Sequence, residues 1–188
     1  RSFLWILDRI VIPVALGAVF IRLGNFMNSE IIGKTTTADH FLAMKFIKGE
    51  EYFGPLGEPA IKAKTNIEDA QQAFTAVATD PQFKTILEAF PYRYPAQLYE
   101  AISYAFVFGI LLFLYWKTEA RNKAGYLFGL FLILLWSIRF VVEFVKESQG
   151  GFEQYTIFNA LSTGQWLSIP FILIGFYFVW KAKVVKEA

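Results

Sequence analysis

The sequence contains no cysteine and only one histidine among its 188 residues. The lack of cysteine excludes a disulfide framework, a thiolate metal site and a cysteine nucleophile within this chain. Charged residues make up only 18%, and the formal net charge is +2, which neither indicates nor excludes a nucleic-acid partner. No internal repeat and no low-complexity tract is visible.

The sequence is instead rich in apolar residues, and these are gathered into long runs. Hydrophobic residues make up 55% and aromatic residues 19% of the chain. A transmembrane helix needs roughly 20 mainly apolar residues, and only helices and closed barrels satisfy their backbone groups in lipid. Four blocks have about this length: residues 3–20, 98–116, 124–144 and 161–180. The sequence predicts an all-α integral membrane protein with about four transmembrane helices; buried helices of a soluble protein are the alternative.

Positive charges predict the orientation of these helices. The link between the second and third blocks carries Lys117, Arg121 and Lys123, and the tail after the fourth block is also rich in lysine. Since Lys and Arg near the ends of spans collect in the cytoplasm, we expect both segments there. Residues 22–94 and 146–159 are then extracytoplasmic. The first residue is Arg1, and no leader with a cleavage site precedes the first block, so we expect a piece of a longer chain.

The chain divides into three parts on this interpretation. Residues 1–33 form the first helix and a polar segment after it, residues 34–93 a small polar extracytoplasmic insertion, and residues 94–188 three helices with a cytoplasmic C-terminus. Apolar spacing over residues 66–90 predicts one or two short amphipathic helices, broken at Asp80–Pro81. Residues 60–64 give a poor signal for a strand, and residues 150–152 are typical of a turn.

Two groups of charged residues lie at the predicted outer helix ends, where ionisable side chains are costly and usually pair or face a polar cavity. Arg139 and Glu143 are four residues apart on one helix, so they share a face and can pair. One interpretation is an interfacial ion pair that anchors the helix. The other is an arginine held by Glu143 for an anionic ligand, because a guanidinium matches two phosphate oxygens at once.

The second group is the segment RLGNFMNSEIIG, residues 22–33. A helix C-cap would explain Gly24 and one asparagine, but not the whole segment. Arg22 can bind an anion, and two arginines on the outer side of a membrane protein indicate a lipid headgroup phosphate or an anionic substrate segment. Further polar groups lie in the segments YPAQLYE, residues 94–100, and TGQWLSIPFILIG, residues 163–175. In the latter, Gln165 and Ser168 could equally seal helix contacts.

These segments resemble those of one family, the prolipoprotein diacylglyceryl transferases. RLGNFMNSEIIG resembles the family signature GRxGNFxNGExxG, and YPAQLYE resembles HPSQLYE. RFVVEFVK, residues 139–146, resembles RFxxEFxR, and TGQWLSIPFILIG resembles the last-helix segment GQxLSxPMI. All four occur in family order across nearly the whole chain.

The resemblance implies the first step of bacterial lipoprotein maturation at the inner membrane, with the active site on the extracytoplasmic side. The diacylglyceryl group of phosphatidylglycerol passes to the lipobox cysteine thiol of a prolipoprotein, and glycerol 1-phosphate leaves. No cofactor or metal is implied. The implied fold is a seven-helix bundle with an outer head, which residues 34–93 would supply, and about three family helices would lie upstream of this chain.

Carried over residue by residue, the resemblance assigns a set of site residues. The catalytic set is Arg22, Glu30, Arg139 and Glu143, and the phosphatidylglycerol-binding set is Arg22, Asn25, Asn28, Gly33, Gln97, Tyr99, Glu100 and Arg139. We expect the two arginines to clamp the phosphate, and Glu30 and Glu143 to orient them.

Two departures from the family pattern bear on the function: Tyr94 stands where the family has His, and Ser29 replaces a Gly. His40 lies outside every motif, and we expect it at the surface. A non-catalytic lipid- or peptide-binding paralogue is the alternative function, which Tyr94 keeps open. A transporter half is a third; it predicts internal symmetry and mid-membrane charges, whereas here the charges lie at the outer edge.

Overall fold

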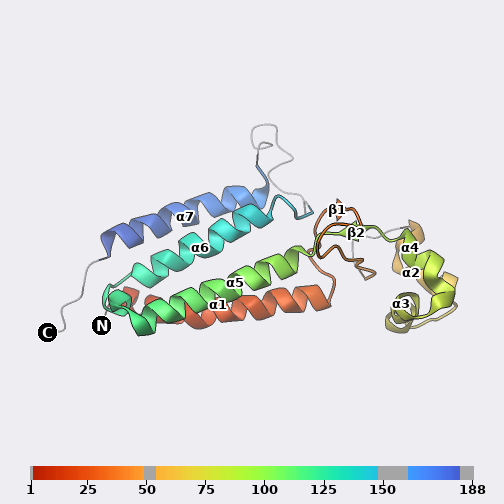
Figure 1. The fold of residues 1–188 in the computed structure, drawn as a ribbon, viewed down its shortest axis with the longest axis horizontal. Helices are drawn as coiled ribbons and strands as arrows, with labels where there is room; N and C mark the ends of the chain where they lie inside the picture. The colour runs from red at the N-terminus through yellow and green to blue at the C-terminus, as the bar shows by residue number, and fades with distance from the viewer. Residues whose placement is uncertain (1, 49–53, 148–160, 183–188) are drawn as a thin grey trace. The chain divides into compact units, whose positions relative to one another are not determined.

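The structure is a computed structural model that describes residues 2–48, 54–147 and 161–182. Its secondary structure is 72% helical. The chain forms two compact units (Figure 1). We call Arg1–Leu23, Leu98–Phe144 and Ser148–Ala188 the helical unit, and Gly24–Gln97 with Val145–Glu147 the head unit.

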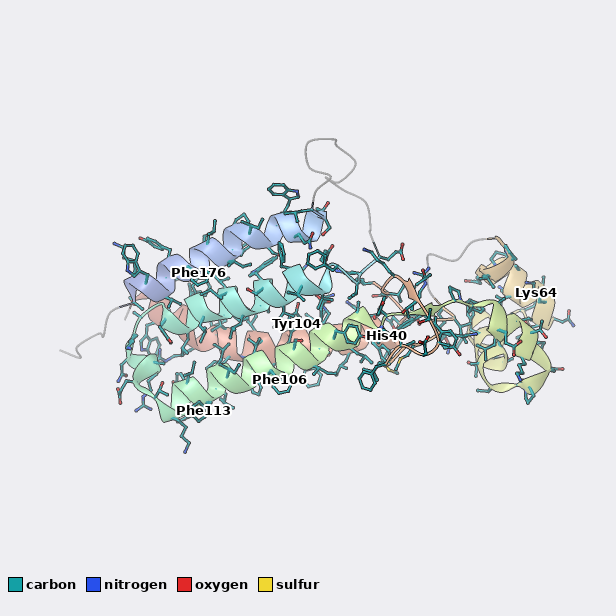
Figure 2. All side chains as sticks on the ribbon, turned by 45° about the horizontal axis from the view of Figure 1, so that its top comes forward. His40, Lys64, Tyr104, Phe106, Phe113 and Phe176 are labelled. Atoms are coloured by element: carbon teal, nitrogen blue, oxygen red, sulfur yellow. The ribbon has the colours of Figure 1, made fainter. Side chains whose placement is uncertain are left out.

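Four long helices contribute to the helical unit: α1 (Phe3–Met27), α5 (Ala96–Lys117), α6 (Tyr126–Val142) and α7 (Thr163–Lys181). Helices α1, α5 and α7 are long and apolar enough to cross a membrane, which confirms three of the four predicted spans. Helix α6 is also apolar but has 17 residues, at the lower limit of about 17–25 for a span. Phe106, Phe113 and Phe176 are among the exposed large side chains (Figure 2). The chain is an all-α membrane protein.

The core of the helical unit joins three helices. Val11, Ile12 and Ala15 of α1 cluster with buried residues of α5 and α6, among them Leu111 and Leu127. Helix α7 packs on α6, as Figure 1 also shows.

The contact between α6 and α7 depends on two glycines. A methyl group added at Gly129 would lie 2.7 Å from the carbonyl oxygen of Gly175, and one added at Gly175 would lie equally close to that of Gly129. Small residues let two transmembrane backbones approach in this way. The rings of Trp136 and Phe171 stack at 4.1 Å in the same interface.

A buried carboxylate caps the first turn of α6. Asp8 of α1 is 1% exposed, and its two oxygens accept from the backbone N–H groups of Gly125 (2.6 Å) and Phe128 (2.9 Å). The N-cap residue Gly125 has no side chain to cap the helix, so Asp8 supplies the acceptor from another helix. The sequence analysis did not identify this role.

The head unit contains short helices and one small sheet. Its helices are α2 (Glu58–Thr65), α3 (Ala70–Thr79) and α4 (Lys84–Ala89), with 3₁₀ turns η1 (Gly54–Leu56) and η2 (Pro81–Phe83). Ile61, Ala73, Val77 and Phe90 form its core. Strands β1 (Thr35–Thr36) and β2 (Tyr92–Arg93) pair antiparallel. The helices predicted within residues 66–90 are confirmed, and so is the break at Asp80, whose side chain caps η2.

The strand considered for residues 60–64 is wrong, because these residues lie within α2. Pro59 stands in the first turn, where a missing N–H costs nothing. Ile61 and Thr65 are buried one helical turn apart, so the segment follows the helical period. With one large apolar side chain in five residues, the sequence pattern could not separate the two periods. The turn expected at residues 150–152 lies outside the described residues.

Candidate active site

A buried ion pair lies in the helical unit near the C-terminal end of α1. Nε of Arg22 lies 2.9 Å from Oε2 of Glu100 on α5, and the two side chains are 10% and 2% exposed. The hydroxyl of Tyr104, one turn along α5, donates to Oε1 of Glu100 at 3.2 Å. The carboxylate therefore contacts two side chains. Among the described residues no donor is aligned on Oε2 for a hydrogen bond, so the contact with Arg22 is an ion pair by distance.

Sequence reasoning did not find Tyr104, and it did not find that Glu100 is the carboxylate partner of Arg22. The spacing of four between Glu100 and Tyr104 on a helix was the available signal. Figure 2 shows Tyr104 on α5.

Glu143 lies against the first turn of α7. It caps the C-terminus of α6, and a methyl group added at Gly164 would lie 2.5 Å from its carboxyl carbon and 2.6 Å from each oxygen. A helix N-terminus carries partial positive charge, which favours a carboxylate there. The guanidinium of Arg139 lies over the ring of Trp136, 5.0 Å from its centroid.

The expected pairing of Arg139 with Glu143 is therefore not observed: the ion pairs in the described part of the chain do not include it. Helical spacing permits the pair. However, the Glu143 carboxylate lies against the first turn of α7, and the Arg139 guanidinium lies over the ring of Trp136.

Gln165 and Ser168 serve the packing of α7. Gln165 forms a capping box with Ser162, and its amide donates to the carbonyl of Phe140 on α6 at 3.3 Å. The hydroxyl of Ser168 donates to the carbonyl of Gly164 at 2.7 Å. Both residues are buried, at 4% and 0% exposure. These contacts favour the interpretation that they seal helix contacts.

In the head unit, the backbone of Glu30 is bonded on both sides. Its N–H donates to the carbonyl of Asn25 at 2.9 Å, and its carbonyl accepts from Nε2 of Gln97 at 2.6 Å. Its side chain accepts from the amide of Asn28 at 3.2 Å. Gln97 is fully buried, and within the described residues its Oε1 has no donor. A buried acceptor without a donor costs about 1–3 kcal/mol, so the site retains an unused hydrogen-bonding group.

Two left-handed residues flank Glu30. Ser29 has φ 59° and Ile31 has φ 58°. This conformation is rare outside glycine, and for a β-branched residue such as isoleucine it is a genuine outlier. Strain of this kind persists only where surrounding contacts hold it in place. The departure at Ser29, where the family signature has glycine, thus falls on a position whose backbone favours glycine.

Gly33 is the point where three motifs meet in the head unit. Its N–H donates to the carbonyl of Tyr94 at 3.0 Å, and the N–H of Lys34 donates to the carbonyl of Val145 at 2.8 Å. A methyl group at Gly33 would lie 2.7 Å from Cβ of Tyr94 and 2.8 Å from the Val145 carbonyl. Only glycine allows so close an approach. The end of the signature segment thus lies between the start of the second motif and the end of the third.

The remaining predicted residues lie on the same segments. Asn25 on α1 and Tyr99 on α5 are half-buried. His40 is exposed, as expected, and its ring contacts that of Tyr94 edge-on with centroids 4.6 Å apart. Over residues 2–48, 54–147 and 161–182, no cluster of three or more His, Asp or Glu side chains gathers that could hold a metal ion.

Comparison with known proteins agrees with these motifs. The sequence model of the prolipoprotein diacylglyceryl transferase family matches residues 1–181. Relatives from several bacteria carry the name phosphatidylglycerol–prolipoprotein diacylglyceryl transferase. The protein of Tolumonas auensis is 38% identical over 93% of this chain and 50% of its own length. That of Bacteroides fragilis is 37% identical over 98% and 52%, and that of Chloroherpeton thalassium 36% over 100% and 53%. The chain spans about half the length of these relatives.

Proposed function

The chain belongs to the prolipoprotein diacylglyceryl transferase family, and from this membership we propose the function of the whole protein. It transfers the diacylglyceryl group of phosphatidylglycerol to the lipobox cysteine thiol of prolipoproteins and releases glycerol 1-phosphate. The names of the relatives give both substrates. It does so in the bacterial inner membrane, with the active site on the extracytoplasmic side.

The observation that carries this proposal is the buried group of Arg22, Glu100 and Tyr104. A charged pair inside a membrane helix bundle is costly, and such residues usually serve a polar substrate. Glu100 fixes Arg22 from one side. The helical unit also contains Arg139 on α6, so it holds two guanidinium groups of the kind that suits a phosphate.

The reaction needs charge stabilisation at the leaving group. The thiolate sulfur of the lipobox cysteine bonds to the glyceryl carbon while the bond from that carbon to the phosphate oxygen breaks. The electron pair passes to the phosphate oxygen, where Arg22 and Arg139 stabilise the charge as it develops. The thiolate is the nucleophile, so the thiol proton first passes to a base of the whole protein, and glycerol 1-phosphate then leaves as the phosphate anion. No metal or cofactor enters this step.

In the head unit, we assign polar groups to the oxygens of the lipid headgroup and the glyceryl moiety. Asn25, Asn28 and Gln97 can bind hydroxyl and ester oxygens, and Oε1 of Gln97 supplies the unused acceptor. Tyr99 follows Gln97 by two residues on α5. Glu30 provides a carboxylate whose position is fixed by the hydrogen bonds of its backbone. Gly33 fixes the end of the same signature segment.

The test uses the full-length gene product in vesicles that contain phosphatidylglycerol. A lipobox peptide with one cysteine is added, and its mass is followed. We expect a diacylglyceryl mass gain on the cysteine, which Arg139→Ala and Arg139→Lys both abolish, because a lysine cannot contact two phosphate oxygens. Arg121→Ala is the matched control, since Arg121 is exposed in the link between α5 and α6. Near-normal turnover by Arg139→Lys would contradict the bidentate contact.

A second candidate is a non-catalytic binder of lipid or peptide. Tyr94 favours it, because the family motif has histidine at this position and the only histidine here, His40, contacts Tyr94 from the surface. Retention of the peptide without any mass gain would favour the binder. In that case Tyr94→His is the first reversion to make.

A further inference from the structure

Arg93 and Glu147, which belong to no predicted site, form an ion pair next to the signature segment. Nη1 of Arg93 lies 2.8 Å from Oε2 of Glu147 and donates to the carbonyl oxygen of Gly33 at 3.0 Å. The Arg93 side chain is only 11% exposed, whereas that of Glu147 is 42% exposed. The guanidinium therefore joins a carboxylate of one segment to a backbone carbonyl of another.

This contact completes the hydrogen bonding of Gly33. Its N–H donates to the carbonyl of Tyr94, and its carbonyl accepts from Arg93. On the other edge of the segment, the N–H of Glu147 donates to the carbonyl of Ile32 at 3.3 Å. Gly33 is thus held from two sides.

The contact lies three residues from Glu30, whose backbone is also bonded on both sides. Between the two fixed points stands Ile31 in a left-handed conformation. A strained connection of this length has few alternative conformations, so a shift of the Gly33 carbonyl has to be passed on to Glu30. The bonds at Gly33, Ile32 and Glu30 hold the strained turn.

We propose that Arg93, held by Glu147, is a positioning residue that fixes the carbonyl of Gly33 and thereby sets Glu30 for the transfer reaction. This inference rests on the proposed function for its kinetic part. Arg93 touches no substrate in this account and acts through the backbone of the signature segment. A purely structural ion pair would instead affect the stability of the head unit and leave the kinetics of the folded protein unchanged.

The kinetic test compares Arg93→Ala, Arg93→Lys and Glu147→Gln in the full-length protein with the lipobox peptide assay. We expect Arg93→Ala to lower kcat by roughly 10–100-fold, because a misplacement of about 1 Å in an active site can cost 10²-fold. The KM for phosphatidylglycerol should change less than kcat. Arg93→Lys should retain part of the activity, since an ammonium can still donate to the carbonyl.

Glu147→Gln should lower kcat less than Arg93→Ala does, and the double variant should be no worse than Arg93→Ala alone, because the two residues act as one unit. The matched control is Lys84→Ala. Lys84 forms an exposed ion pair with Glu88 at 3.8 Å within the same head unit and lies outside every motif in the sequence. A kcat in Arg93→Ala equal to that of the wild type, or an equal loss in Lys84→Ala, would overturn the inference.

Amide hydrogen exchange separates this inference from the proposed function. In Arg93→Ala, exchange at residues 29–33 should become faster while exchange in α3 stays unchanged. Unchanged exchange at residues 29–33 would overturn the positioning role even if the transferase activity fell. If the wild-type protein has no transferase activity, the proposed function fails, and the exchange result still decides whether Arg93 holds the segment.

Discussion

Two buried carboxylates of the helical unit, Asp8 and Glu100, differ in the partners that surround them. Asp8 is 1% exposed and Glu100 is 2% exposed, so burial alone does not distinguish them. Asp8 accepts from two backbone N–H groups at the start of α6. Glu100 contacts two side chains, those of Arg22 and Tyr104, near the C-terminal end of α1.

On the proposed function, the difference separates a carboxylate that serves the fold from one that serves the reaction. Backbone donors of a helix cannot turn toward a ligand without unwinding the helix, so Asp8 is committed to α6. The guanidinium of Arg22 has five donors, and a side-chain partner can share them with a phosphate. An acidic residue in a membrane helix is therefore a candidate for function only after its partners are known.

The largest expected effect is that of Glu100→Gln. The substitution removes the negative charge from a buried ion pair, and breaking such a pair costs about 3–5 kcal/mol of stability. It should also abolish most of the transferase activity, because Arg22 loses its orientation. Thermal unfolding in detergent and the lipobox peptide assay measure the two effects. Retained activity would show that Glu100 is as structural as Asp8.

Asp8→Ala should destabilise the protein without changing its chemistry. It leaves two backbone donors at the start of α6 without their acceptor, at about 1–3 kcal/mol for each unsatisfied group. The midpoint of thermal unfolding should fall, while kcat for each folded molecule stays at the wild-type value. A lower kcat of the folded protein would show that Asp8, like Glu100, contributes to the reaction.

Gly164→Ala tests the contact between Glu143 and α7. The added methyl group would lie 2.5 Å from the carboxyl carbon of Glu143, and such overpacking costs about 1–3 kcal/mol. We expect lower stability and lower activity, since Glu143 must move. Gly109→Ala is the matched control, because a methyl group there meets nothing within 4 Å. Equal behaviour of the two variants would remove Glu143 from the site.

Ser29→Gly should have the smallest effect, and a stabilising one. Ser29 has φ 59°, and glycine adopts this conformation without a steric penalty. The gain should be about 0.5 kcal/mol, because the greater flexibility of glycine in the unfolded chain offsets part of the relief. Chemical denaturation of the head unit in the full-length protein measures it. A loss of stability would show that the serine side chain contributes a contact that outweighs the strain.

The pattern of apolar residues along the chain predicted most of the helices. It failed in the short segment of residues 60–64. The runs of apolar residues located α1, α5 and α7, because a long run can satisfy its backbone in lipid only as a helix. The break at Asp80–Pro81 followed from the chemistry of proline and aspartate. Residues 60–64 were predicted as a strand but are helical, since five residues with one large apolar side chain fit both the strand period and the helix period.

The sequence by itself determined the membrane class, the helices and the set of motif residues, because each depends on residues close together in the chain. Only the tertiary structure decided the pairing of those residues. It gave Arg22 its partner Glu100, directed Glu143 to Gly164, and brought Tyr94 and Val145 to Gly33. Such contacts join segments far apart in sequence, and helical spacing says which side chains share a face but not which face meets another helix.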